Sequence, residues 1–108
     1  MNPIIAIDAH NVSFGGGITH LIEFINHCDP RRDNFYKIIV FVKGDVIKHL
    51  PRRPFIELVN ISQCFVRVIG FNLPRLSLYK KVIKSYDFDC MFILGGSALV
   101  ITKPFVVL

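Results

Sequence analysis

The N-terminal part of the chain alternates short apolar runs with one helical pattern, and this alternation constrains the fold more than any other feature. The run Ile4 to Asp8, IIAID, has the length and apolar character of a buried strand, and a glycine-rich stretch follows it up to Gly17. Apolar residues then recur at positions 18, 21, 22 and 25, which is the spacing of one helix face, and Pro30 predicts that this helix ends by Asp29. Tyr36 to Val42, YKIIVFV, is a second strand. Strand, glycine loop, helix and strand form a βαβ unit, so the two strands are expected to be parallel.

Further elements are expected between this unit and Tyr86. In chain order they are a charged turn over 31–34, a short helix capped by Asp45 and ending at Leu50, a strand over Phe55–Val59, a helix over Ile61–Phe71 and a helix over Leu73–Tyr86. The stretch Ile61–Phe71 is ambiguous, because its β-branched residues suit a strand while two rows of apolar residues at helical spacing favour a helix. Pro74 suits the first turn of the last helix.

The most apolar part of the chain, Cys90 to Leu108, is divided into pieces of strand length by Gly95-Gly96 and Lys103-Pro104. We therefore interpret it as buried strands, at Cys90–Leu94 and Phe105–Leu108, rather than as a membrane helix. The fold class predicted is α/β: one Rossmann-like domain spanning residues 1–108, with a mainly parallel sheet and flanking helices. Because the chain stops inside an apolar strand, we expect the domain to be incomplete.

The composition excludes several classes of protein. With 52% hydrophobic and 19% charged residues, the 108-residue chain is not expected to be disordered, and its apolar excess suggests a partner surface. Three widely spaced cysteines indicate neither a disulfide framework nor a zinc module and fit a reducing cytoplasm. The first residues lack a basic region and a long apolar run, so we do not expect them to be a secretory signal. The net charge of +5 favours anionic ligands or an anionic membrane surface, but the basic pairs are dispersed and lack a stacking platform, so nucleic acid is not predicted.

Two glycine turns are the strongest candidates for a binding site. Gly15, Gly16 and Gly17 lie between a strand and a helix N-terminus, where backbone N–H groups and the helix dipole favour a phosphate; a tight packing turn is an equally good interpretation. The second turn follows a later strand and is expected at the same edge of the sheet; it consists of Gly95, Gly96 and Ser97. The pattern of a hydrolase nucleophile is absent around this serine.

His10 follows the first strand, between Asp8 and Asn11, and is open to two interpretations. A histidine beside a carboxylate is suited to acid–base work, but a solvated loop histidine is the simpler interpretation, with Asp8 ordering the glycine loop. His20 and His27 lie seven residues apart, which is not the spacing of a helical metal site, so no metal is predicted.

Three segments together resemble the N-terminal domain of a GT-B fold retaining glycosyltransferase of the large group 1, or family 4-like, type. They are IIAIDAHNVSFGGGITHLIEFI, LPRLSLYKKVIKSYDFDCMFILGGSA and KPFVVL, and they span most of this chain but about the first third of such an enzyme. The resemblance implies that Gly15, Gly16 and Gly17 close over the donor diphosphate. It also places Gly95, Gly96 and Ser97 in the same cleft, with His10 and Asn11 as further cleft-lining residues.

The resemblance implies transfer of a sugar from a nucleotide-sugar to a hydroxyl of an acceptor glycan or lipid-linked sugar, as in surface-polysaccharide biosynthesis. It implies a cytoplasmic location, with peripheral contact to the inner face of the membrane, and no cofactor or metal besides the donor substrate. The family's catalytic histidine region and its donor-binding second domain have no counterpart here, so no catalytic residue is assigned and the chain is expected to be inactive alone. A stand-alone nucleotide- or phosphate-binding α/β module, or a non-catalytic remnant that depends on a partner, remain the alternatives.

Overall fold

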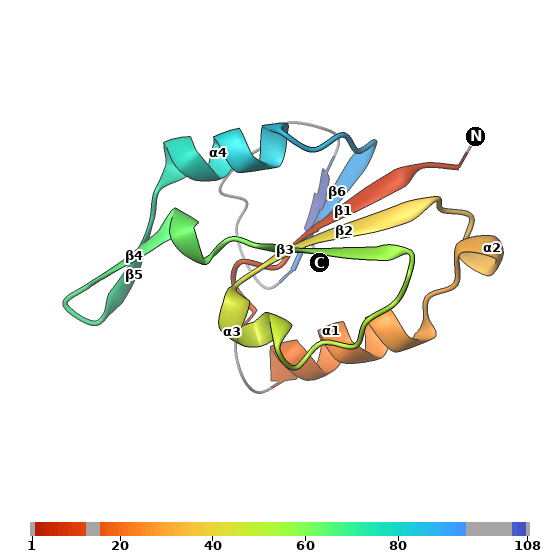
Figure 1. The fold of residues 1–108 in the computed structure, drawn as a ribbon, viewed down its shortest axis with the longest axis horizontal. Helices are drawn as coiled ribbons and strands as arrows, with labels where there is room; N and C mark the ends of the chain where they lie inside the picture. The colour runs from red at the N-terminus through yellow and green to blue at the C-terminus, as the bar shows by residue number, and fades with distance from the viewer. Residues whose placement is uncertain (1, 13–15, 95–104, 108) are drawn as a thin grey trace.

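The computed structural model of the protein describes residues 2–12, 16–94 and 105–107, and it has the expected α/β architecture (Figure 1). Five strands form one parallel sheet in the order β3-β2-β1-β6-β7, with α1 on one face and α4 on the other. The strands are β1 (Ile4–Asp8), β2 (Lys37–Val42), β3 (Ile56–Asn60), β6 (Cys90–Ile93) and β7 (Phe105–Val107). The fold class and these five strands confirm the expectation from the sequence.

Each face of the sheet has its own apolar core, because successive strand residues point to opposite sides. On one face, Ile7, Ile38 and Val40 pack with Leu21 and Ile25 of α1 (Gly16–His27). The opposite face is packed by α4 (Leu76–Lys84). Its core joins Ala6, Ile39, Phe41, Met91 and Ile93 of the strands to Tyr79 and Ile83 of the helix. Strands buried on both faces explain the continuous apolar runs of the sequence.

Two short segments depart from the expected local structure. Residues 31–34 were expected to form a turn, but Pro30–Asp33 forms the short helix α2, because Asp29 Oδ1 accepts the backbone N–H groups of Arg31 and Arg32 at 2.9 and 3.3 Å. Asp45 was expected to cap the next helix, but α3 (Gly44–Ile47) begins two residues earlier than such a cap implies and has Lys43 at its N-cap. Asp45 instead lies within the first turn of α3.

The prediction of a helix over Ile61–Phe71 was wrong. The 3-10 helix η1 (Ser62–Cys64) leads into an antiparallel hairpin formed by β4 (Phe65–Val68) and β5 (Phe71–Pro74). The β-branched and aromatic residues of this stretch favour strand over helix, and the turn at Ile69-Gly70, with φ of 48° and 79°, reverses the chain. Pro74 is therefore the last residue of β5 and not part of the following helix.

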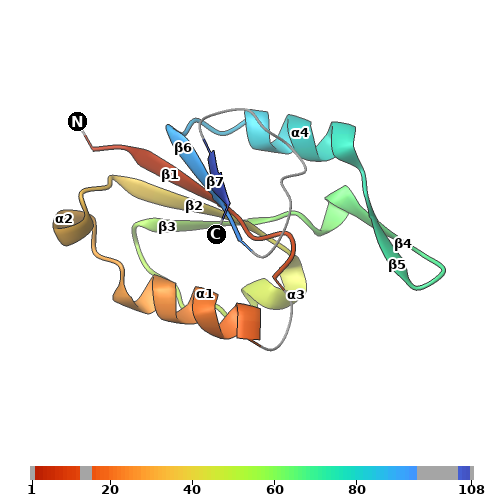
Figure 2. The ribbon, with the colours of Figure 1, turned by 180° about the vertical axis from the view of Figure 1, so that it is seen from behind.

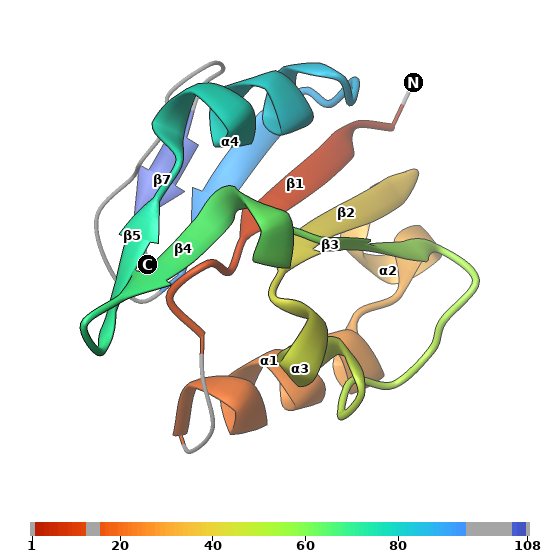
Figure 3. The same ribbon diagram turned by 60° about the vertical axis from the view of Figure 1, so that its left-hand side comes forward.

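The β4–β5 hairpin projects away from the sheet, as Figures 1 and 3 show, and α4 begins at its base. Figure 3 also shows that α4 lies over β6 and β1, while α1 and α3 lie on the other side of the sheet. Within the described residues, no helix has the length and apolar character needed to cross a membrane.

Candidate functional site

The candidate site lies where the parallel strands end, at the carboxyl edge of the sheet. From β1 the chain adds β2 and β3 on one side and β6 and β7 on the other, so the direction of winding reverses between β1 and β6. The two strands are joined at that point by the Leu94 N–H, which donates to the Asp8 carbonyl at 3.0 Å. Open parallel sheets bind ligands outside the strand ends at such a reversal. Figure 2 shows the arrangement from behind, with α1 beginning near the same edge.

A buried network of three polar side chains stands behind this edge. Asp8 Oδ1, at the end of β1, is 2.6 Å from His10 Nδ1 and accepts the hydroxyl of Tyr79, from α4, at 2.5 Å. It also accepts the backbone N–H of His10 at 3.2 Å. Asp8 and Tyr79 have no exposed surface, and His10 is 4% exposed. The interpretation of His10 as a solvated loop residue was therefore wrong: the chain turns back after β1, and α4 and the hairpin cover the ring.

The network determines which of its atoms donate and which accept hydrogen bonds. Burial, together with the negative charge of Asp8 and the hydrogen bond to it, raises the pKa of Tyr79 well above its usual range, so the phenol remains a donor. Because Asp8 Oδ1 accepts from the ring, His10 carries a hydrogen on Nδ1, which leaves Nε2 as the ring nitrogen without a partner in this network. Asp8 Oδ2 is buried and accepts no hydrogen bond from the described residues, so the carboxylate can accept one more.

Two aromatic rings contact the histidine, and a lysine lies over one of them. The His10 ring stacks on Phe65, at the base of the hairpin, with 6.0 Å between centroids and 14° between planes. It meets Tyr79 edge-on, also at 6.0 Å. Lys43, the first residue after β2, places its Nζ 4.7 Å from the Phe65 ring centroid. A half-buried ammonium at the carboxyl edge adds positive charge where an anionic ligand would approach.

The structure describes only part of the first glycine turn. Gly16 and Gly17 form the first turn of α1, so the helix begins two residues before the expected Ile18, and Gly15 lies outside the described residues. A Cβ added to Gly17 would find Val12 Cγ1 at 3.8 Å, which is ordinary contact, so protein packing does not require glycine there. Asn11 is exposed beside this turn. The second turn, Gly95, Gly96 and Ser97, lies entirely outside the described residues.

A groove of about 640 Å³ opens from this edge between α1 and the sheet. Asn11, Gly17 and His20 line it near the start of α1, but most of its wall is apolar and includes Ile7 and Phe92. Helix α1 only partly covers β1 and β6 on this face of the sheet, and the groove runs along the uncovered part. Its apolar wall suits no phosphate, so we place the candidate anion site at the strand ends and the start of α1.

Other sequence candidates are not brought together. His20 and His27 are both exposed on α1, and His27 Nδ1 bonds to the Glu23 carbonyl at 2.8 Å. In the part of the chain that the structure describes, no cluster of three or more His, Cys, Asp or Glu side chains could hold a metal. Sequence reasoning missed Tyr79, Phe65 and Lys43 as members of the site. Tyr79 lies within the helix predicted over Leu73–Tyr86, and nothing near it in the sequence signals its bond to Asp8.

No protein-family model, curated protein or solved structure matches this chain.

Proposed function

We propose that this chain binds the diphosphate of a nucleotide-sugar at the carboxyl edge of its sheet, as the N-terminal Rossmann-like part of a retaining GT-B glycosyltransferase. The observation that carries the proposal is the reversal of winding between β1 and β6, with a helix that begins in glycines directly beyond it. The proposal gives the chain a binding role toward donor and acceptor and assigns it no catalytic residue.

The start of α1 supports phosphate binding for two physical reasons. The first N–H groups of a helix have no partner within the helix, and the helix dipole is positive at this end. Glycine at position 17 exposes the backbone, although the surrounding protein has room for a side chain. Because packing does not require glycine at position 17, the glycine there is consistent with a ligand that approaches the backbone closely.

Two side chains would complete the interaction. Lys43 carries a positive charge at the end of β2, and its ammonium lies over the ring of Phe65. His10, held by Asp8 and stacked on Phe65, would offer its second ring nitrogen, Nε2, as an acceptor to a ligand hydroxyl. Neither group requires a metal to bind a diphosphate.

The test is a titration of the full chain, labelled with ¹⁵N, with nucleoside diphosphates and nucleotide-sugars such as UDP-glucose. We expect amide shifts at Asn11, Gly16, Gly17 and Lys43 at millimolar ligand. No shift at millimolar concentrations, or shifts confined to other surfaces, would contradict the proposal. Equal affinity for a diphosphate and its nucleotide-sugar would favour the stand-alone phosphate-binding module.

Gly17→Ala separates a ligand role from a structural one. Because the added methyl has space and alanine is the better helix former by about 1 kcal/mol, the melting temperature should stay equal or rise. If a phosphate approaches the backbone here, affinity should fall by about tenfold or more. Asn26→Ala, which raises helix propensity near the other end of α1, is the matched control and should bind normally. Lys43→Gln should weaken binding, whereas Lys48→Gln on the exposed side of α3 should not.

A further inference from the structure

Large apolar side chains are exposed together on the projecting hairpin. Ile69, at its tip, is 91% exposed, and Leu73 and Leu76, on β5 and at the start of α4, are each 51% exposed. Among the described residues, the other large apolar side chains with comparable exposure are Phe24 and Tyr36, which lie on separate elements. Single exposed apolar residues are ordinary, but three on one projecting segment indicate a contact surface.

The same segment carries positive charge without any negative charge. Between Leu58 and Tyr86 there is no Asp or Glu. Five of the chain's 13 Lys and Arg residues lie in this interval: Arg67, Arg75, Lys80, Lys81 and Lys84. The last four of these are exposed. We call Ile69, Leu73, Leu76 and these four exposed basic residues the hairpin surface.

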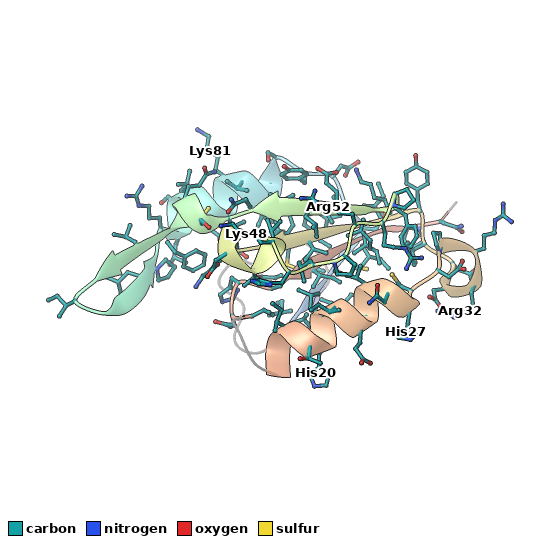
Figure 4. The ribbon with its side chains drawn as sticks, turned by 60° about the horizontal axis from the view of Figure 1, so that its bottom comes forward. His20, His27, Arg32, Lys48, Arg52 and Lys81 are labelled. Atoms are coloured by element: carbon teal, nitrogen blue, oxygen red, sulfur yellow. The ribbon has the colours of Figure 1, made fainter. Side chains whose placement is uncertain are left out.

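The charges of the hairpin surface adjoin its apolar residues. Leu76, Lys80 and Lys84 follow one another at intervals of four along α4 and so form one row, while Tyr79 and Ile83 face the core. Figure 4 shows Lys81 pointing away from the body on the side opposite to α1, which carries His20 and His27. The lysine face of α4 therefore continues directly into the base of the hairpin.

We propose that the hairpin surface docks on an anionic lipid bilayer. Ile69, Leu73 and Leu76 would enter the interfacial layer, and the lysines of α4 would lie among the headgroup phosphates. This inference goes beyond the proposed sugar-nucleotide site and uses none of the residues assigned to that site.

The chemistry of the hairpin surface favours lipid over a protein partner. Lysine is depleted from protein interfaces, because its flexible, strongly hydrated ammonium is costly to fix and desolvate. At a membrane, by contrast, the apolar stem can lie along the lipid while the ammonium stays in the headgroup layer. Each lysine near an anionic surface strengthens binding by about fivefold at physiological ionic strength. An isoleucine at a narrow turn also presents too little area for a stable protein contact but can insert singly between lipids.

The first experiment is co-sedimentation of the full chain with vesicles of phosphatidylcholine alone and with added phosphatidylglycerol. We expect binding to the anionic vesicles that weakens with salt and little binding to the neutral ones. The double variant with Lys80→Gln and Lys84→Gln should have a vesicle partition coefficient about 25-fold lower, because each lysine contributes about fivefold. The control removes two other exposed positive charges, with Lys48→Gln and Arg52→Gln, and should change it much less. Figure 4 shows Lys48 and Arg52 over α3 and the loop beyond it, away from Lys81.

Ile69→Asn tests the apolar tip without threatening the fold. Ile69 has a φ of 48°, a conformation that costs a β-branched residue energy and that asparagine adopts readily, so the variant should be at least as stable as the parent. It should partition about tenfold less to anionic vesicles. Tyr36→Ser, which removes an exposed apolar side chain beside the opposite edge of the sheet, should partition normally.

Insertion itself can be read from fluorescence, because the chain has no tryptophan. Leu73→Trp should shift its emission to the blue on anionic vesicles and be quenched by brominated lipid. Tyr36→Trp should show neither change.

Three results would overturn the proposal. The first is absence of binding to anionic vesicles, and the second is equal binding by Ile69→Asn and the parent chain. The third is a self-association of the chain that Ile69→Asn abolishes while vesicles are not bound, since the hairpin surface would then be a protein contact.

Discussion

Removal of the Tyr79 hydroxyl should destabilise the fold by about 2 kcal/mol. The phenol donates to Asp8 Oδ1 at 2.5 Å, and both side chains have no exposed surface. A hydrogen bond to a charged group contributes about 1.5–3 kcal/mol, and Tyr79→Phe keeps the ring and its packing, so no cavity adds to the cost. With a urea slope of about 1–3 kcal/mol per molar, the midpoint should fall by about 1 M.

The measurement is urea unfolding of the full chain at neutral pH, followed by far-ultraviolet circular dichroism. Tyr36→Phe, which removes the hydroxyl of an exposed tyrosine, should change the free energy of unfolding by less than about 0.5 kcal/mol. A double-mutant cycle with Asp8→Asn should give a coupling of about 1 kcal/mol or more, because the two groups are in direct contact. A loss below about 0.5 kcal/mol in Tyr79→Phe, or additive effects in the cycle, would show that the bond from Tyr79 to Asp8 does not stabilise the fold.

The same bond gives a pH dependence of defined sign. The folded state raises the pKa of Tyr79, so this group's contribution to stability is complete below the ordinary phenol pKa of about 10. Above that pH the unfolded chain loses the proton while the folded chain keeps it, and the contribution declines as pH rises. The stability difference between the parent chain and Tyr79→Phe should therefore shrink above about pH 10, and a difference that grows there would contradict the assignment.

Two further predictions concern packing and thiol chemistry. Gly44→Ala should lower the free energy of unfolding by about 1–3 kcal/mol, because the added Cβ would lie 2.6 Å from Nδ2 of Asn60. The Asn60 side chain cannot easily move away, since its Oδ1 accepts the backbone N–H of Ser62. In urea unfolding, adding Asn60→Ala to Gly44→Ala should recover much of the loss. Burial raises the pKa of all three cysteine thiols. Cys28 and Cys64 are buried, whereas Cys90 is half-buried. A disulfide reagent should therefore modify Cys90 first and reach the other two thiols only on unfolding. Equal modification rates of the three thiols in the folded chain would show that the cores are not packed as described.

Much of the architecture follows from local patterns in the sequence. The runs IIAID, YKIIVFV and CMFIL form strands because a parallel sheet covered on both faces requires apolar residues on both sides of each strand. Helix α1 follows from apolar residues spaced as on one face of a helix. Over Ile61–Phe71, apolar residues at helical spacing predicted a helix, whereas the β-branched and aromatic residues favour strands. The structure follows the strand propensity, and the turn at Ile69-Gly70 closes the hairpin.

Local sequence patterns specify the α/β class, the βαβ unit and the position of the glycine-started helix, because each of these depends on neighbours within a few residues. The sequence also places His10 two residues after Asp8. Tertiary packing, in contrast, buries His10 and brings Tyr79, 71 residues from Asp8 along the chain, into the network. It alone also set the β3-β2-β1-β6-β7 order, which creates the reversal at the carboxyl edge. Such contacts depend on which helix packs on which face of the sheet, and no local pattern of residues specifies that choice.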